Sequence, residues 1–147
     1  MPLNNEFFTD FDDASSKYDS EGRLLSKGQV LFFNRSQCVD DNNCLLVLYH
    51  ASNTEFTTFD EKRIGSGGGS IYGNGFYFSD DSFNVEIYGK YVREFYLNLK
   101  NPFRWEPIDE DADATYNLDI GDYVAFKPEQ IKLCSNKMPT ATADAAA

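Results

Sequence analysis

The chain has 147 residues with 24 acidic and 13 basic side chains, which gives a formal net charge of −11. Such an acidic surface repels phosphate backbones and argues against sequence-independent binding to DNA or RNA. The length suits one domain, and the polar N-terminus and short apolar runs indicate a soluble, cytoplasmic protein without a signal peptide or membrane span. Three cysteines without metal-ligand spacing indicate reduced thiols and no metal site.

The N-terminal part of the chain contains few apolar residues that could anchor it. We expect 1–28 to be an extension that drapes over the domain or frays. A short strand or one helical turn is predicted at 29–35. The clearest strand is 45–50 (LLVLYH), a continuous apolar run that is typical of a strand buried on both faces. It delivers His50, the only histidine, at its polar end, where a scaffold presents a group to a cleft.

Glycine and acidic residues dominate the connections in the next part of the chain. A glycine-rich loop is predicted at 64–75, followed by a short strand at 76–78. The residues at 79–82 (SDDS) are N-cap candidates for a helix over 83–88. Further strands are predicted at 91–99, at 123–126 and near 130–132. An exposed acidic loop is expected at 105–117, and a disordered tail or linker at 135–147.

These elements favour an α+β domain over 29–134, with short, mostly antiparallel strands and one or two small helices. Antiparallel pairing is expected because the connections between the strands are short. A glycine string around 65–69 neither follows a convincing strand nor opens a helix, so a Rossmann fold fits poorly.

Three places in the sequence could carry chemistry, and each has a structural alternative. His50 is either a hydrogen-bonded structural residue or a functional one. Tyr77 and Tyr88 could clamp a flat aromatic ring between them, or they could pack the core. Asp122 enters a strand either as a solvated edge residue or as a carboxylate that faces His50 and Tyr77. The residues alone leave these alternatives open.

Five stretches taken together resemble a known family. They are LYHAS, FTTFD, YGNGFYFSDD, YGKYVREFYLNLKNPF and YVAFKPEQIK. In order and spacing, 29–132 resembles the ADP-ribosyltransferases of the diphtheria-toxin and poly(ADP-ribose) polymerase class. It is closer still to the small transferase domain of phage and mobile-element polyvalent proteins. The resemblance implies a split β-sheet core and NAD as the substrate.

The resemblance also implies roles for individual residues. His50 would hydrogen-bond the ribose next to nicotinamide, and the backbone of Ala51, followed by Ser52, would hold the carboxamide. Tyr77 would be the central tyrosine of the family's His-Tyr-Glu signature. Tyr88 would stack on the nicotinamide ring from the other side.

The catalytic glutamate position of the family falls on Asp122. Glu129 is a rival carboxylate, although strand alternation from Asp122 directs it to the opposite face. Polar and basic side chains beside the glycine loop are candidates to meet the pyrophosphate. These are Lys62, Arg63 and Ser66.

The nicotinamide ring of NAD is already cationic and leaves as a neutral molecule, so the site must stabilise an oxocarbenium-like sugar and needs no general acid. Three residues depart from the family pattern. Ala51 replaces a glycine, Val85 replaces a serine, and Asp122 is one methylene shorter than glutamate. A displacement of about 1 Å in a catalytic group can cost on the order of a hundredfold in rate.

The sequence therefore predicts an NAD-dependent mono-ADP-ribosyltransferase. Its acceptor is unidentified: a host protein is expected, and a nucleic acid or small molecule remains open. For a phage-encoded chain, the expected location is the host bacterial cytoplasm. The first alternative is a catalytically degenerate module that binds NAD or ADP-ribose without turnover, and the second is an interaction domain with a defunct cleft. The sequence gives no oligomeric state.

Overall fold

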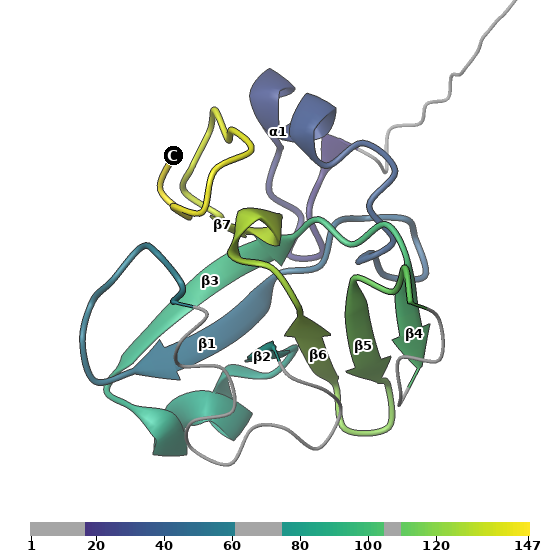
Figure 1. Cartoon of the computed structure of the whole chain (residues 1–147). Helices are drawn as coiled ribbons and strands as arrows, with labels where there is room; N and C mark the ends of the chain where they lie inside the picture. Colours follow the sequence, from purple (N-terminus) through teal and green to yellow (C-terminus); the bar gives the residue numbers. More distant parts are fainter. Residues whose placement is uncertain (1–16, 61–74, 105–109) are drawn as a thin grey trace, which may run out of the picture.

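The computed structural model describes residues 17–60, 75–104 and 110–147. Seven strands form one mixed sheet in the order β4-β5-β6-β2-β1-β3-β7 (Figure 1). The strands are β1 (Leu48–Ser52), β2 (Phe76–Ser79), β3 (Tyr91–Leu97), β4 (Pro102–Arg104), β5 (Ala114–Asn117), β6 (Asp122–Ala125) and β7 (Ile131–Leu133). Neighbours are antiparallel except β4 and β5, which are parallel. This mixed sheet with few helices is compatible with the expected α+β class.

Three short helices accompany the sheet in the described part of the chain. They are α1 (Lys27–Phe32) and the 3₁₀ helices η4 (Ser82–Tyr88) and η5 (Pro128–Gln130). Helix α1 settles the alternatives left open at 29–35. A capping box between Ser26 and Gln29 starts it, because each side chain accepts a hydrogen bond from the other residue's backbone N–H. Helix η4 confirms the predicted helix, and the Asp81 side chain caps it by accepting from the Phe83 N–H.

The strand predicted at 45–50 is shifted: β1 begins at Leu48 and passes through His50 to end at Ser52. The residues before Leu48 take partners outside the sheet. The Leu46 N–H donates to the Cys38 carbonyl (3.0 Å), and the Val47 N–H donates to Ser20 Oγ (2.9 Å). The apolar run is therefore divided between a loop and the sheet, and His50 lies within the strand.

Strands β4 and β5 were not predicted, and β5 corrects the C-terminal part of the loop expected at 105–117. Residues 105–109 lie outside the described part of the chain. The Asp113 carboxylate accepts hydrogen bonds from the backbone N–H groups of Lys100 (2.7 Å) and Asn101 (2.9 Å). This contact aligns the two chain segments that become the parallel pair β4 and β5.

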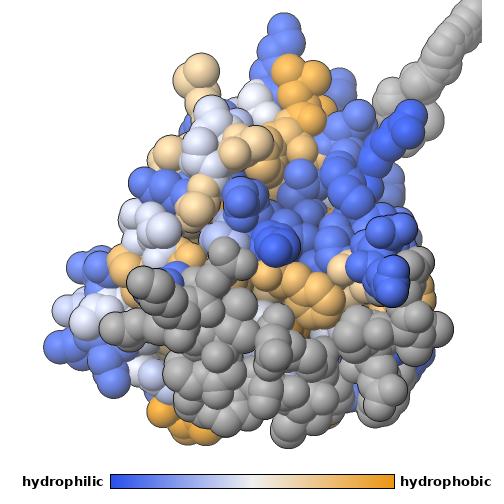
Figure 2. Space-filling view, in the orientation of Figure 1, coloured by the Kyte–Doolittle hydropathy of each residue, from blue (hydrophilic) through white to orange (hydrophobic). Residues whose placement is uncertain are grey.

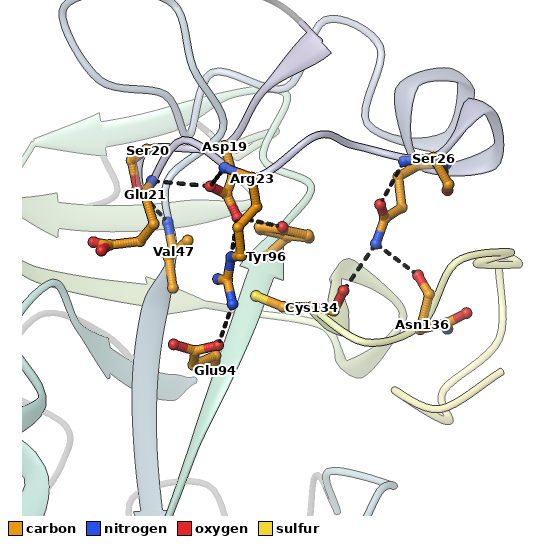
Figure 3. A network of polar contacts seen from close by, with 11 residues as sticks. Asp19, Ser20, Glu21, Arg23, Ser26, Val47, Glu94, Tyr96, Cys134 and Asn136 are labelled. Atoms are coloured by element: carbon orange, nitrogen blue, oxygen red, sulfur yellow. Dashed lines mark hydrogen bonds and ion pairs between the residues drawn. The ribbon is translucent and has the colours of Figure 1, made fainter.

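Two clusters of apolar side chains pack on the sheet. The larger contains Phe59, Phe76, Phe78 and Phe95 among its buried members. The second lies between the sheet and the N-terminal segment with α1, and it includes Tyr96. The Tyr96 hydroxyl donates to the buried Asp19 carboxylate (2.6 Å), which ties the N-terminal segment to β3 (Figure 3).

The C-terminal segment differs from the expected disordered tail or linker, because in the structure 135–147 lies on the domain beside β7 (Figure 1). Lys132 in β7 is 0% exposed, and its Nζ donates to the carbonyls of Thr142 (2.9 Å), Asp144 (3.0 Å) and Ala147 (2.9 Å). The buried Ala145 donates its N–H to the Thr57 carbonyl (2.6 Å). Backbone carbonyls that satisfy a buried ammonium order this segment despite its low complexity.

Most of the coloured surface in Figure 2 is hydrophilic, as the net charge leads one to expect. Apolar side chains come to the surface at η4, where Phe83 and Ile87 are exposed. Among the described residues, no helix combines the length and the hydropathy that crossing a bilayer requires.

Candidate functional site

The candidate site lies where β1 and β2 part. The two strands meet at a single residue pair, Tyr49 opposite Ser79, whereas β1 pairs with β3 over its whole length. Strand β2 pairs in turn with β6 over all four of its residues. The sheet therefore has two well-paired parts, and the pair of Tyr49 and Ser79, which we call the junction, joins them.

Beyond this pair the ladder between β1 and β2 ends, and we call this break in the ladder, at Ala51, the opening. The Glu94 carbonyl accepts a hydrogen bond from the Cys134 N–H (3.1 Å), so Glu94 turns its peptide groups toward β7. Glu94 is paired with Tyr49, so the pair that exchanges hydrogen bonds between β1 and β3 is the next one, His50 and Arg93. His50 therefore turns its N–H and C=O toward β3. Successive residues alternate between the two neighbours of their strand, so the N–H and C=O of Ala51 point away from β3, to the side on which β2 has left the ladder. A planar primary carboxamide offers the donor and the acceptor that could complete the ladder there.

The imidazole of His50 is enclosed by aromatic rings. Its centroid lies 5.0 Å from that of Phe59 and 5.5 Å from that of Phe78, with Phe56 and Phe95 slightly farther away. Within the described residues the ring has no hydrogen-bond partner. Burial, and secondarily the charge of Arg93, lowers the pKa of His50 to about 4, so the ring is neutral near pH 7.

A pH titration of His50 followed by NMR should give a pKa of about 4 in place of the ordinary 6.5. The assignment is direct because the chain has one histidine. The unfolded chain binds the proton at higher pH than the folded one. The stability that the neutral ring contributes is therefore present above pH 6.5 and is lost as the pH falls toward 4. A titration midpoint near 6.5 would show that the ring is solvated and would contradict this environment.

Asp122 opens β6, where it pairs with Ser79 of β2 on one side and with Asn117 of β5 on the other. It therefore lies one strand away from the junction, across Ser79 from Tyr49. Burial, and secondarily the charge of Asp80, raises the pKa of Asp122 above its ordinary value. The carboxylate is thus half-buried beside a second carboxylate.

Two constraints require a glycine at position 121, just before Asp122. Its φ of +72° lies in the left-handed region that favours glycine. A Cβ built at this position would lie 2.1 Å from Asp80 Oδ1, and the Asp80 N–H donates to the Gly121 carbonyl (2.9 Å). Only glycine lets the chain turn into β6 this close to Asp80, and the turn positions Asp122.

The helix η4 brings Tyr88 to the end of β1. The Asn84 side-chain amide donates to Ser79 Oγ (3.3 Å), which tethers the helix to β2. After Tyr88, Gly89 passes so close to β1 that an added Cβ would lie 2.2 Å from the carbonyl carbon of Ser52. Tyr88 is 62% exposed beside this crossing, so its ring is accessible from solvent.

The sheet pairing decides which of these side chains share a face. Directly opposed residues of an antiparallel pair point to the same side, so Tyr77 and Asp122 leave one face of β2 and β6. Phe78 leaves the other face, and the His50 ring contacts Phe78. His50 therefore does not share a face with Tyr77 and Asp122. One ligand could meet all three only within the opening between β1 and β2.

Comparison with known families bears on this arrangement. A family model described as ADP-Ribosyltransferase in polyvalent proteins matches residues 40–121, more than half of the chain. The chain belongs to this family. No curated protein matches the sequence. Membership confirms the resemblance seen in the sequence and associates this ADP-ribosyltransferase domain with ADP-ribosylation in general, a chemistry for which the family generally uses NAD.

The matched residues of the ADP-ribosyltransferase domain include His50, Tyr77 and Tyr88, and they end one residue before Asp122. The rival carboxylate, Glu129, lies exposed in η5, beyond the end of β6 opposite to Asp122. The pyrophosphate candidates fall outside the described residues. They are Lys62, Arg63 and Ser66.

Ser52 and Val85, two further residues that the resemblance singled out, can also be located in the ADP-ribosyltransferase domain. Ser52 Oγ accepts a hydrogen bond from the Thr54 N–H (3.1 Å), so this hydroxyl shapes the turn after β1. Val85, which the resemblance places at a serine position, is the buried residue of η4.

Sequence reasoning missed Arg93, which pairs with His50 across β1 and β3. The alternation of residues along β3 could have indicated Arg93. Arg93 shares its parity with Phe95 and Leu97, both 0% exposed, so a charged side chain stands on the buried face.

Proposed function

We propose that this domain binds NAD in the opening between β1 and β2, cleaves the nicotinamide–ribose bond and transfers one ADP-ribose unit to an acceptor. The observation that carries the proposal concerns Ala51 and His50 in β1: among the described residues, β2 does not pair with β1 at Ala51, and the imidazole of His50 has no hydrogen-bond partner. A carboxamide fits the edge of β1 there, and a ribose hydroxyl fits the imidazole. The family match supports the reaction class.

The elements around the opening supply the remaining groups. Tyr77 and Tyr88 come from β2 and from the end of η4, and both elements contact the junction. In the proposed complex the two rings hold the nicotinamide ring between them. Because η4 is tethered to β2 through Ser79, the position of Tyr88 depends on the same junction that exposes Ala51.

The reaction breaks the bond between C1′ of the ribose and the ring nitrogen of nicotinamide. The bonding electrons leave with nicotinamide, which becomes neutral, while positive charge grows on the ribose. The carboxylate of Asp122 stabilises this charge, and its half-buried position strengthens the interaction. The acceptor then forms a bond to C1′ and releases its proton to solvent. Neutral His50 holds a ribose hydroxyl without adding charge.

The alternative function is a module that binds NAD or ADP-ribose without turnover. Two substitutions favour it: Ala51 places a methyl where the family has glycine, and Asp122 is one methylene shorter than the family's glutamate. Both changes act on the geometry of the bound nicotinamide riboside and would reduce the rate more than the affinity.

The test combines calorimetry of NAD binding with chromatographic measurement of free nicotinamide, using the full chain. We expect NAD to bind and nicotinamide to accumulate with time, with water as the acceptor when no other is present. Binding without release, under all acceptors tried, would replace the transferase by the binding module. If NAD does not bind, both functions are rejected.

A further inference from the structure

Arg93 and His50 are two polar side chains that lie side by side, and the described residues satisfy their hydrogen-bonding groups incompletely. They are directly opposed in β3 and β1, so they leave the same face of the sheet with Cβ atoms about 5 Å apart. The guanidinium carbon lies 5.2 Å from the ring centroid of Phe56 and 5.4 Å from that of Phe95. Its Nη2 is buried and has no hydrogen-bond acceptor within 17–60, 75–104 and 110–147.

The nearest carboxylate along the strand is already engaged. Glu94 Oε1 accepts from Arg23 Nη1 (2.8 Å), and Arg23 Nε is bound to Asp19 (2.9 Å), as Figure 3 shows. Among the described residues, no ion pair includes Arg93. Burial lowers the pKa of Arg93, and the charge of Glu55 partly opposes this shift. A half-buried cation therefore keeps one N–H donor for which the described residues provide no acceptor.

Arg93 also borders an open hollow in the surface. The hollow has a volume of about 550 Å³ and is lined by residues of β1, β3 and the end of β7. Arg93 is the basic residue of this lining, which also contains the carboxylates of Glu55 and Glu94. Arg93 is thus reached from solvent on one side and lies beside His50 on the other. A planar guanidinium is a favourable partner for an oxyanion such as a phosphate.

We propose that Arg93 binds the diphosphate of NAD, at the phosphate attached to the ribose that His50 holds. This inference rests on the proposed function. The 5′-phosphate is the anionic group closest to the hydroxyls of that ribose, and Arg93 is the cation closest to His50 along the sheet pairing. A chain with a net charge of −11 also needs a local cation to accept a dianionic group.

The test compares substrates that differ in phosphate content: NAD, nicotinamide mononucleotide and nicotinamide riboside. For Arg93→Gln we expect KM to rise about tenfold or more for the two phosphate-bearing substrates and to stay unchanged for the riboside. Arg93→Lys should recover part of the affinity because it restores the charge. Arg104→Gln, which changes an exposed arginine of β4, is the matched control and should behave like wild type. An equal loss with all three substrates would assign Arg93 a structural role and overturn the proposal.

A second readout does not depend on turnover. Titrating inorganic pyrophosphate into the full chain should shift the NMR resonance of His50, and Arg93→Gln should remove the shift. No shift in the wild-type chain would overturn the Arg93 proposal even if NAD is cleaved. A shift without NAD cleavage would retain the anion site and reject the transferase. Competition by a short RNA oligonucleotide, with KM for NAD unaffected by Arg93→Gln, would assign the phosphate to an acceptor and likewise overturn the proposal.

Discussion

Asp122→Asn should reduce nicotinamide release from NAD by about a hundredfold or more. The amide keeps the size and shape of the side chain but removes the negative charge that stabilises the developing positive charge on the ribose. Burial and Asp80 already disfavour the carboxylate in the folded protein, because they raise its pKa. The substitution should therefore leave the free energy of unfolding unchanged or slightly higher. Chromatography of nicotinamide and urea unfolding measure the two quantities.

Glu129→Gln is the matched control for Asp122→Asn, since it makes the same carboxylate-to-amide change in η5 at the opposite end of β6. We expect its activity to equal that of the wild-type chain. Loss of activity in the Glu129 variant, together with activity in the Asp122 variant, would transfer the catalytic role to Glu129. The raised pKa of Asp122 also predicts that activity declines, as the pH is lowered, at a higher pH than an ordinary aspartate would give.

Lys132→Met should lower the free energy of unfolding by roughly 3 kcal/mol. Methionine fills a similar volume but removes the donors for three carbonyls, those of Thr142, Asp144 and Ala147. Carbonyls that lose their partner must either stay buried without a hydrogen bond or leave the domain with the C-terminal segment. Urea denaturation measures the stability, and hydrogen exchange at the Ala145 N–H reports whether the segment detaches.

The control for this substitution is Lys137→Met, at an exposed lysine of the same C-terminal segment. It should change stability little. Equal unfolding midpoints for Lys132→Met and the wild-type chain would contradict the ordered segment. Detachment of the C-terminal segment would also disturb the candidate site, because the Ala145 N–H donates to the Thr57 carbonyl. Phe59, two residues after Thr57, contacts His50. A change in the His50 resonance should therefore accompany the loss of stability.

The sequence predicted the elements that depend on neighbouring residues. The aromatic and aliphatic residues of 91–99 indicated β3, and the acidic and serine residues at 79–82 indicated the start of η4. Both signals are local, since a cap is completed within one turn and a strand pattern within a few residues. The five motifs likewise indicated the family, because their order along the chain is itself a sequence property.

Only the tertiary structure decided where the pairing of two strands ends and which side chains lie together. The ladder between β1 and β2 ends after the pair of Tyr49 and Ser79, and the register of β1 against β3 puts Arg93 beside His50. Lys132 similarly orders a segment whose own composition suggested disorder. Each result depends on pairing between residues far apart in the chain, and a shift of one residue in register would reverse the faces. Local sequence patterns carry no information about such pairing, so the fold itself had to determine the site.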